Sequence, residues 1–349
     1  MWLKFRRHKL ALVGAFMLII LYVLAVFCEF FSPYDIETRF KILLFSPPTK
    51  IHFVDDSGKF HVRPFVYGLT RTRDRETLKL IYGEDKTQKY FIKFFRRGDP
   101  YKLIGIFPTS IRLFGVDEPG SIFLMGSDSL GRDLFSRILY GARISLSVGM
   151  VGVALSFFLG CVLGGISGFY GGTIDTIIQR VIEILTSIPT IPLWMGLAAA
   201  IPLTWAPLNI YFMITIILSI VGWCGLARIV RGKLMSLREE DFVLAARISN
   251  VRESAIISRH LLPSFITYLI VHLTLSIPAM ILGETALSFL GLGLRPPVVS
   301  WGVLLRDAQN IKAVSMHLWL VIPGLFVIAT VLAFNFLGDG LRDAADPYT

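Results

Sequence analysis

The chain has 349 residues, of which 54% are hydrophobic and 17% charged, and its net charge is +10. A mean hydropathy of +0.64 excludes an ordinary soluble domain and indicates a membrane protein. No nucleic-acid motif accompanies the positive charge, so we attribute it to loops that orient the chain in the membrane. Three cysteines without CxxC spacing and six scattered histidines predict neither a disulfide framework nor a metal site.

Six apolar segments are long enough to cross a bilayer as helices. They are residues 10–31, 144–169, 177–201, 208–227, 265–287 and 318–337. The first follows four basic residues and lacks a small-residue cleavage site, so we expect a retained helix that starts in the cytoplasm. Six spans then return the chain end, 339–349, to the cytoplasm. The loop 228–263, with seven arginines and lysines, is expected there too.

The region 32–143 is expected outside the cytoplasm, although it holds 19 of the 35 basic residues. Long loops cross the membrane largely regardless of charge. Two stretches are typical of β-hairpins. In the first, 52–54 and 60–62 flank the turn-like residues 55–59; in the second, 77–82 and 89–95 flank 83–86. The sequence therefore predicts a small β-rich extracytoplasmic insert at about residues 47–108.

A polar segment precedes the second span and contains Asp128, Gly131, Arg132 and Asp133. Asp128 can cap a helix that begins at Ser129, and the polar and apolar stripes of that helix suit the outer membrane interface. We expect a structural elbow here, with direct contact to a solute as the less favoured alternative.

The loop between the fourth and fifth spans is expected to form two short helices. Residues 237–247 carry acids early and an arginine late, as helices prefer. Asn250 can adopt the left-handed conformation that ends a helix. A second helical stretch, 252–262, is expected to end before Pro263. The pair is either an interfacial hairpin or a rigid protrusion that docks into another protein.

Within the spans, a few residues have both a packing and a functional interpretation. Gly164 and Gly168 allow another helix to approach closely, with a hinge for alternating access as the alternative. Arg180 and Glu183 lie one turn apart, so an ion pair can lower their burial cost, with gating as the alternative. Glu284, near the outer end of the fifth span, is expected to face a water-filled pathway or a partner subunit.

Four motifs, in this order, resemble the permease subunits of binding-protein-dependent ABC importers of the oligopeptide and dipeptide class. They are GSDSLGRDLFSR at 126–137, AAR at 245–247 with RHLLP at 259–263, ETALSFLGLG at 284–293 with SWG at 300–302, and LGDGLRDAADP at 337–347. Leu244 stands where the family motif has glutamate, and Asn250 where it has glycine. The resemblance covers the first span and most of 126–347. Nothing is transferred to 47–108, where an added docking area and a tolerated insertion remain open.

The resemblance implies an all-α polytopic protein with the type I ABC importer permease fold, in a prokaryotic inner membrane. It implies a transmembrane subunit that is not an enzyme. Its partners would be a second permease subunit in a heterodimer, two ATPase subunits that bind ATP and Mg²⁺, and an extracytoplasmic binding protein. Peptides are the first expectation for the solute, with oligosaccharides and nickel complexes as alternatives.

The resemblance also assigns roles to residues. Coupling to the ATPase is expected from Glu239, Glu240, Asp241, Leu244, Ala245, Ala246, Arg247, Asn250 and Pro263. Candidates for the pathway and its gates are Glu284, Arg180, Glu183, Gly164 and Gly168. The sequence contains no GxxxxGK[ST] string, so the chain is expected to bind no cofactor and to take energy from a partner.

Two other classes of protein compete with this interpretation. A membrane enzyme would need a catalytic pair within the spans, and Arg180 with Glu183 does not form a convincing one. A channel or membrane scaffold would have no reason to present a docking helix pair on the cytoplasmic side.

Overall fold

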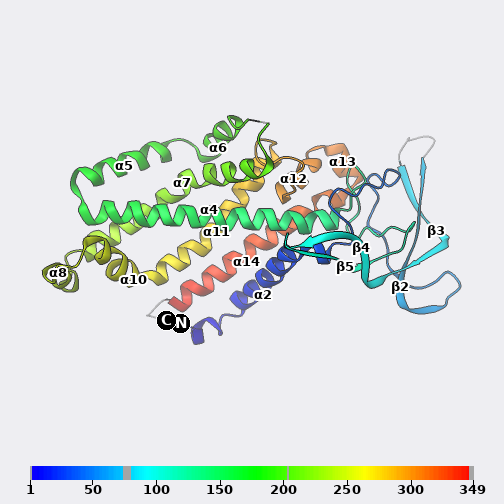
Figure 1. Ribbon diagram of the computed structural model, residues 1–349, viewed down its shortest axis with the longest axis horizontal. Helices are drawn as coiled ribbons and strands as arrows, with labels where there is room; N and C mark the ends of the chain where they lie inside the picture. The colour runs from blue at the N-terminus through cyan, green and yellow to red at the C-terminus, as the bar shows by residue number, and fades with distance from the viewer. Residues whose placement is uncertain (1, 74–79, 203, 346–349) are drawn as a thin grey trace. The chain divides into compact units, whose positions relative to one another are not determined.

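The computed structural model describes residues 2–73, 80–202 and 204–345 (Figure 1). The chain forms two compact units. One consists of Met1–Ile19, Leu146–Pro297 and Ile328–Thr349, and is helical where it is described. The other consists of Ile20–Ser145 and Val298–Val327 and holds the β strands.

Within the described ranges, five helices are long and apolar enough to cross a membrane, and the count is six if a bent helix pair is taken as one broken span. The five are α2 (Lys9–Val26), α4 (Leu134–Tyr170), α7 (Pro207–Leu237), α11 (Ile266–Phe289) and α14 (Ile322–Ala345). Each matches a predicted span, because about 20 apolar residues are needed to cross the hydrocarbon core. The polytopic helical fold is therefore confirmed.

The third span differs from the prediction. It is not one helix over 177–201 but α5 (Gly172–Ser187) followed by α6 (Thr190–Ala199), with a bend of 87° between them. Pro189 lies at the break, and proline disfavours helical backbone in the residue before it. Ile188 is accordingly extended, with φ −90° and ψ 131°.

Shorter helices connect the spans. They are α1 (Trp2–Phe5), α3 (Cys28–Phe31), α8 (Asp241–Ile248), α9 (Glu253–Ala255), η1 (Ile256–Leu261), α10 (Leu262–Ser264), α12 (Trp301–Leu305), η2 (Arg306–Gln309), α13 (Ile311–Met316) and η3 (Leu318–Val321). In the β-containing unit, Trp301 of α12 is fully buried, and its indole Nε1 donates to the carbonyl oxygen of Ile138 in α4 at 3.1 Å. This buried anchor holds α12 against the start of α4.

Glycines allow α4 and α7 to pack closely. A Cβ atom added at Gly164 would lie 2.5 Å from the carbonyl oxygen of Ala227, and one at Gly168 would lie 2.6 Å from that of Arg231. Real Cβ atoms do not approach backbone oxygens so closely. The packing interpretation of these two glycines is therefore confirmed.

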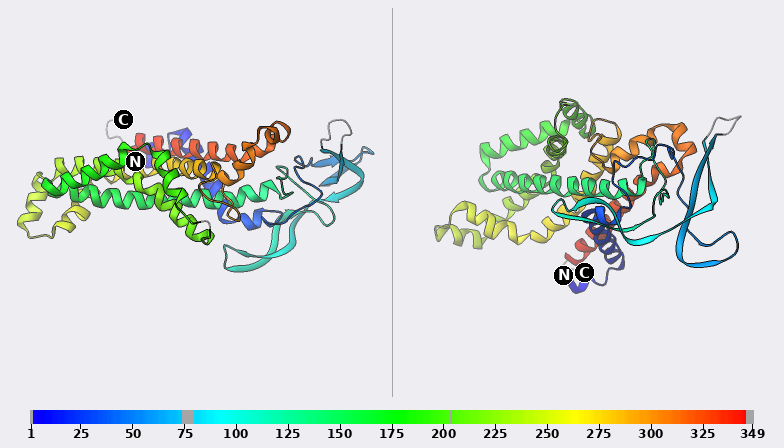
Figure 2. Two further views of the ribbon diagram at one scale, coloured as in Figure 1. Left: turned by 90° about the horizontal axis from the view of Figure 1, so that it is seen from above. Right: turned by 45° about the vertical axis from the view of Figure 1, so that its right-hand side comes forward.

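The β strands form two separate sheets (Figures 1 and 2). The first contains β1 (His52–Val54), β2 (Phe60–Arg73) and β3 (Leu80–Phe91) in that order, all antiparallel. The second is the β4–β5 ribbon, in which β4 (Lys93–Leu103) pairs with β5 (Phe107–Gly115). Val54 pairs with Phe60, so the first predicted hairpin is confirmed.

The second predicted hairpin is wrong. Residues 83–86 do not turn the chain; Gly83 and Asp85 lie inside β3, opposite Thr70 and Gly68 of β2. The pairing register then shifts, so residues 86–88 form a bulge. Asp85 accepts a hydrogen bond from the Thr87 amide at 3.0 Å, a local turn that fits within the bulge. Part of the predicted strand 77–82 lies outside the described residues.

β2 and β3 form the next hairpin, and its connection, residues 74–79, lies outside the described residues. The turn between β4 and β5 lies at residues 104–106, where Ile104 and Gly105 have φ values of 54° and 73°. The strands continue to Gly115, so the β-rich insert extends beyond the predicted limit at residue 108.

The segment before α4 is an elbow, but the predicted helix at Ser129 is absent from the described residues, and α4 begins at Leu134. Asp128 is buried and accepts from the amides of Leu130 and Arg132 at 2.8 and 2.9 Å. Its carboxylate also pairs with the side chains of Arg132 and Arg137.

Asp133, instead of Asp128, lies where a helix is capped. It accepts from the Ser136 amide at 2.8 Å in the first turn of α4. Gly131 has φ 73°, a conformation that favours glycine, and its carbonyl oxygen accepts from the Phe40 amide at 2.9 Å. The elbow is therefore held by buried polar contacts.

Candidate functional site

The loop between α7 and α11 forms a compact helical hairpin, here called the α8–α10 hairpin (residues 241–264). Asn250 separates its two arms and has φ 55°, so the predicted left-handed helix end is confirmed. The amide of Val251 donates to the carbonyl oxygen of Ala246 at 3.1 Å and closes the turn.

One face of the α8–α10 hairpin is buried. Val243 of α8 and Ile256 and Leu261 of η1 are fully buried, and they share a hydrophobic cluster with Leu234 at the end of α7. Burial of such side chains stabilises by about 1.5–3 kcal/mol each. The hairpin is therefore packed firmly against α7.

The opposite face of α8 is exposed and largely apolar. Leu244 is 44% exposed and Ile248 87% exposed, and the two lie one helical turn apart. Ala245 is also exposed, as are the acidic residues Glu239, Glu240 and Asp241 that precede this face. An apolar projection flanked by carboxylates is a surface suited to another protein. Leu244, which replaces the glutamate of the family motif, makes this surface apolar.

Two of the residues expected to couple to the ATPase lie outside the exposed face of α8. Ala246 is only 9% exposed and packs into the hydrophobic cluster, so it supports α8 from within. Pro263 does not follow the helix end but lies inside α10. Proline is tolerated in a first helical turn, and the preceding π-helical turn, η1, makes this possible. The side chain of Arg247 lies outside the described residues.

An ion pair that the sequence reasoning missed connects α5 with α7. Arg231 binds Asp175 in a bidentate manner, with Nε–Oδ1 and Nη2–Oδ2 distances of 2.5 and 2.6 Å. Ser167 of α4 donates to the same carboxylate at 2.5 Å. The available signal was an arginine late in an apolar helix, which needs a partner near the membrane.

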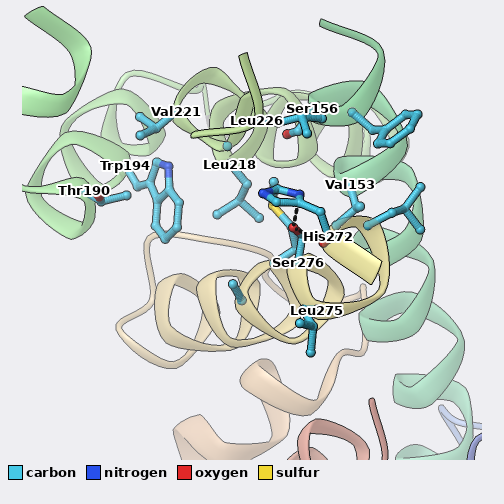
Figure 3. Close-up of a pocket in the computed structure, with 15 residues that line it drawn as sticks. Val153, Ser156, Thr190, Trp194, Leu218, Val221, Leu226, His272, Leu275 and Ser276 are labelled. Atoms are coloured by element: carbon cyan, nitrogen blue, oxygen red, sulfur yellow. Dashed lines mark hydrogen bonds between the residues drawn. The ribbon is translucent and has the colours of Figure 1, made fainter. Parts of the chain in front are cut away.

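A cavity of about 290 Å³ lies among α4, α6, α7 and α11 (Figure 3). Its walls are mostly apolar. The polar groups on them come from Ser156, Thr190, Trp194, His272 and Ser276. Trp194 and His272 face the cavity from opposite sides, and Ser276 donates to the carbonyl oxygen of His272 at 2.7 Å.

The indole N–H group of Trp194 lacks a hydrogen-bond acceptor. Its Nε1 atom is buried and has no hydrogen-bond partner among the described residues. Buried tryptophan N–H groups usually find an acceptor. The wall of the cavity therefore contains an unsatisfied donor.

A second, open cavity of about 1430 Å³ lies in the same unit. Its polar lining includes His8, Lys233, Asp339, Arg342 and Asp343, which belong to the chain start, the end of α7 and the end of α14. His272, Leu275 and Ser276 line both cavities. This turn of α11 therefore separates the two cavities. The smaller one is here called the apolar chamber, and the larger one the charged vestibule.

The predicted pathway and gating residues do not gather at these cavities. The predicted ion pair of Arg180 and Glu183 is present at 2.7 Å, but the side chains are 74% and 53% exposed on α5. Glu284 is fully buried, and its carboxylate accepts from Ser288 at 2.7 Å. Glu284 lines neither of the two cavities, and its role in a pathway stays a prediction. Gly164 and Gly168 serve the α4–α7 contact.

Two family profiles match the chain. The profile described as the binding-protein-dependent transport system inner membrane component matches residues 128–349. The profile of the N-terminal transmembrane domain of oligopeptide transport permease C matches residues 1–48. Together they contain the five long apolar helices and the bent α5–α6 pair, and the β strands lie between the two matched regions.

Several known proteins are similar to this chain. The oligopeptide transport system permease protein OppC of Bacillus subtilis (strain 168) is 30% identical over 346 residues, 99% of this chain and 88% of that protein. The dipeptide permease DppC of the same organism is 41% identical over 230 residues, 66% of this chain and 70% of that protein. OppC of Escherichia coli (strain K12) is also 41% identical over 230 residues, with 66% and 73% covered.

Among solved structures, an inward-facing form of the MetNI methionine ABC transporter matches with a TM-score of 0.47 and 16% identity. The match covers 60% of this chain and 96% of that chain.

Proposed function

Since this chain belongs to the family of binding-protein-dependent transport system inner membrane components, we propose that it forms one half of the membrane pathway of an ATP-driven peptide importer. It is a multi-pass inner-membrane permease subunit. The choice of peptides is supported by the profile matched at residues 1–48 and by relatives named as dipeptide and oligopeptide permeases. The second half of the pathway would come from another permease subunit.

The proposed orientation has both termini and the α8–α10 hairpin in the cytoplasm. Support comes from the charged vestibule, because residues of the chain start, of the end of α7, of the start of α11 and of the end of α14 line it together. These segments therefore share one end of their unit. The segments at that end include the four basic residues of 4–9 and the loop 228–263 with seven arginines and lysines, as is typical of cytoplasmic sides of membrane proteins.

The α8–α10 hairpin is the proposed contact with the ATPase. The single observation that carries this proposal is the exposed apolar pair of Leu244 and Ile248 on a helix whose other face is buried. ATP and Mg²⁺ would bind in the two partner subunits, and this chain would hydrolyse nothing. A binding protein on the opposite side would deliver the solute.

The hairpin has a physical route to the apolar chamber. Its buried face packs on Leu234 of α7, and Leu218, Gly222 and Leu226 of the same helix line the chamber. The bidentate pair of Arg231 with Asp175 connects α7 to α5, the first half of the bent third span. A displacement of the hairpin by the ATPase would therefore be transmitted to the chamber walls.

Co-purification of the chain with its co-expressed partner subunits tests this contact. Leu244→Lys and Ile248→Glu place charges on the exposed face without disturbing the buried one; lysine is used at position 244 because glutamate would restore the residue of the family motif. We expect both to lose the ATPase and keep the second permease subunit. Val62→Glu, at a position that is 88% exposed on β2, is the matched control and should keep both partners. Retention of the ATPase by the two hairpin variants would remove the hairpin from the interface.

A further inference from the structure

The tip of the β4–β5 ribbon exposes apolar side chains in an unusual concentration. Ile104 is 44% exposed, Ile106 69% and Phe107 63%, and at the base of the ribbon Phe94 and Phe95 are 61% and 66% exposed. A two-stranded ribbon has no hydrophobic core of its own to hide them. Several exposed apolar side chains gathered at one tip indicate an interaction site.

The base of the ribbon is fixed beside the end of a membrane span. Arg112 of β5 donates from Nη1 to the carbonyl oxygen of Ser32 at 3.0 Å, and the rings of Phe95 and Phe30 are 6.3 Å apart. Phe30 belongs to α3, which begins two residues after α2 ends. The ribbon is therefore anchored at the level where the chain leaves the hydrocarbon core.

The ribbon has the length and direction needed to contact the bilayer surface. Arg112 and Phe107 lie five positions apart in β5, a reach of about 17 Å for an extended strand. The headgroup layer on each side of a bilayer is only about 5–8 Å thick. In Figures 1 and 2 the ribbon points away from the β1–β3 sheet.

The net positive charge of the β4–β5 ribbon indicates which kind of surface it binds. Residues 93–115 contain five basic residues and one acidic residue. Lys93 and Arg96 both pair with Asp117. Arg97 and Lys102, by contrast, have no ion-pair partner within the described ranges. Aromatic and aliphatic side chains flanked by such cations match the boundary between lipid headgroups and acyl chains.

We infer that the tip of the β4–β5 ribbon inserts Ile106 and Phe107 into the leaflet that surrounds the α3 end of α2, while Arg97 and Lys102 bind the phosphates of anionic lipids. The ribbon thereby acts as a second, peripheral membrane contact that tethers the β-rich insert. This inference depends on α2 being a span and not on the identity of the solute.

The test places a nitroxide at Ile106→Cys in the full chain, assembled with its partners in nanodiscs that contain phosphatidylglycerol. Val62→Cys, on β2, is the aqueous control. The unsubstituted chain controls for labelling of the native cysteines, which are buried. Collision rates with oxygen and with a water-soluble nickel chelate report whether each label lies in lipid or in water.

The inference predicts a ratio of oxygen to nickel collisions severalfold higher at position 106 than at position 62. Adding Arg97→Glu with Lys102→Glu, or replacing the anionic lipid by a zwitterionic one, should lower the ratio at 106. Equal ratios at the two positions would overturn membrane contact. Shielding of position 106 only after the binding protein is added would identify a protein-docking surface instead. A ratio that is high but insensitive to charge would overturn the role of anionic lipid.

Discussion

The guanidinium of Arg231 and the carboxylate of Asp175 form a bidentate ion pair across α7 and α5. The two residues are 56 positions apart, and their side chains are 30% and 14% exposed. The pair joins the helix that carries the α8–α10 hairpin to the first half of the bent third span. It is therefore the polar connection through which we expect hairpin motion to reach α5.

Removal of one partner of this pair should destabilise the chain. Arg231→Gln leaves a partly buried carboxylate without its counter-ion, and we expect a loss of about 2 kcal/mol. This is below the value for fully buried pairs because water reaches the arginine. Asp175→Asn should cost a similar amount. Thermal unfolding of the parent and the two variants in detergent measures these losses of stability.

The double variant separates coupling from two independent losses. If the two side chains interact, Arg231→Gln with Asp175→Asn should be more stable than the sum of the single losses indicates. Strict additivity would show that the pair contributes no interaction energy.

Close packing of α4 on α7 predicts a sharp cost for Gly164→Ala. The added methyl group would lie 2.5 Å from the carbonyl oxygen of Ala227, which belongs to backbone and cannot rotate away. We expect a loss of about 1–3 kcal/mol, as for other overpacked sites. Gly225→Ala on α7 is the matched control, because nothing lies within 4 Å of its added Cβ. That control should be neutral or stabilising by up to about 1 kcal/mol. Equal melting temperatures for both variants would refute the packing argument.

Removal of the unpaired indole N–H group of Trp194 should affect the rate of transport but not the stability of the chain. Trp194→Phe removes the buried N–H group while keeping an aromatic ring in the chamber wall. Loss of an unsatisfied donor offsets the smaller ring, so we expect stability within about 1 kcal/mol of the parent. If the donor binds the solute, the rate of uptake should nevertheless fall. Trp194→Ala, by contrast, should lose clearly more stability than Trp194→Phe, because it removes the whole ring from a partly buried position. Unchanged uptake by the phenylalanine variant would leave the donor without a role in transport.

Acid should destabilise the folded β-rich insert, because protonation of Asp55 removes a stabilising contribution. Its buried carboxylate accepts hydrogen bonds from Lys89 at 2.8 Å and from the amides of Ser57 and Lys59 at 3.0 Å each. Lys89, followed by the Ser57 and His61 side chains, holds the pKa of Asp55 well below its usual range. A depressed pKa stabilises the folded state above the unfolded value of about 3.9, and this contribution is lost as the pH falls further.

Hydrogen exchange of the β1–β2 hairpin, corrected for the intrinsic rate, measures this effect. Protection should be constant from pH 7 to about pH 4 and fall at lower pH. Asp55→Asn should show lower protection at pH 7 and little further change in acid. An identical acid response of the parent and the variant would assign the loss to other carboxylates.

The sequence predicted the spans well because bilayer thickness sets their length directly. The break in the third span was also readable, since Pro189 follows Ile188 in an apolar run, but length alone did not reveal it. The turn at Asn250 followed from the conformational freedom of asparagine.

Other features depend on contacts that are distant in the sequence. Residues 83–86 have the composition of a turn, yet pairing with β2 determines that they continue a strand. Ala246 and Ile248 both belong to α8, but only the packing of the hairpin on α7 shows that one is buried and the other exposed. The partner of Arg231 and the chamber at Trp194 likewise required the assembled helices.

The most direct test of the central claim is uptake into proteoliposomes. The chain, its second permease subunit and the ATPase are reconstituted together, and the binding protein and labelled dipeptide or oligopeptide are added on the opposite side from ATP. We predict accumulation that requires ATP and the binding protein and that Ile248→Glu abolishes while Val62→Glu does not. Accumulation that proceeds without ATP, or that is unchanged by Ile248→Glu, would contradict the account of an importer driven through the α8–α10 hairpin.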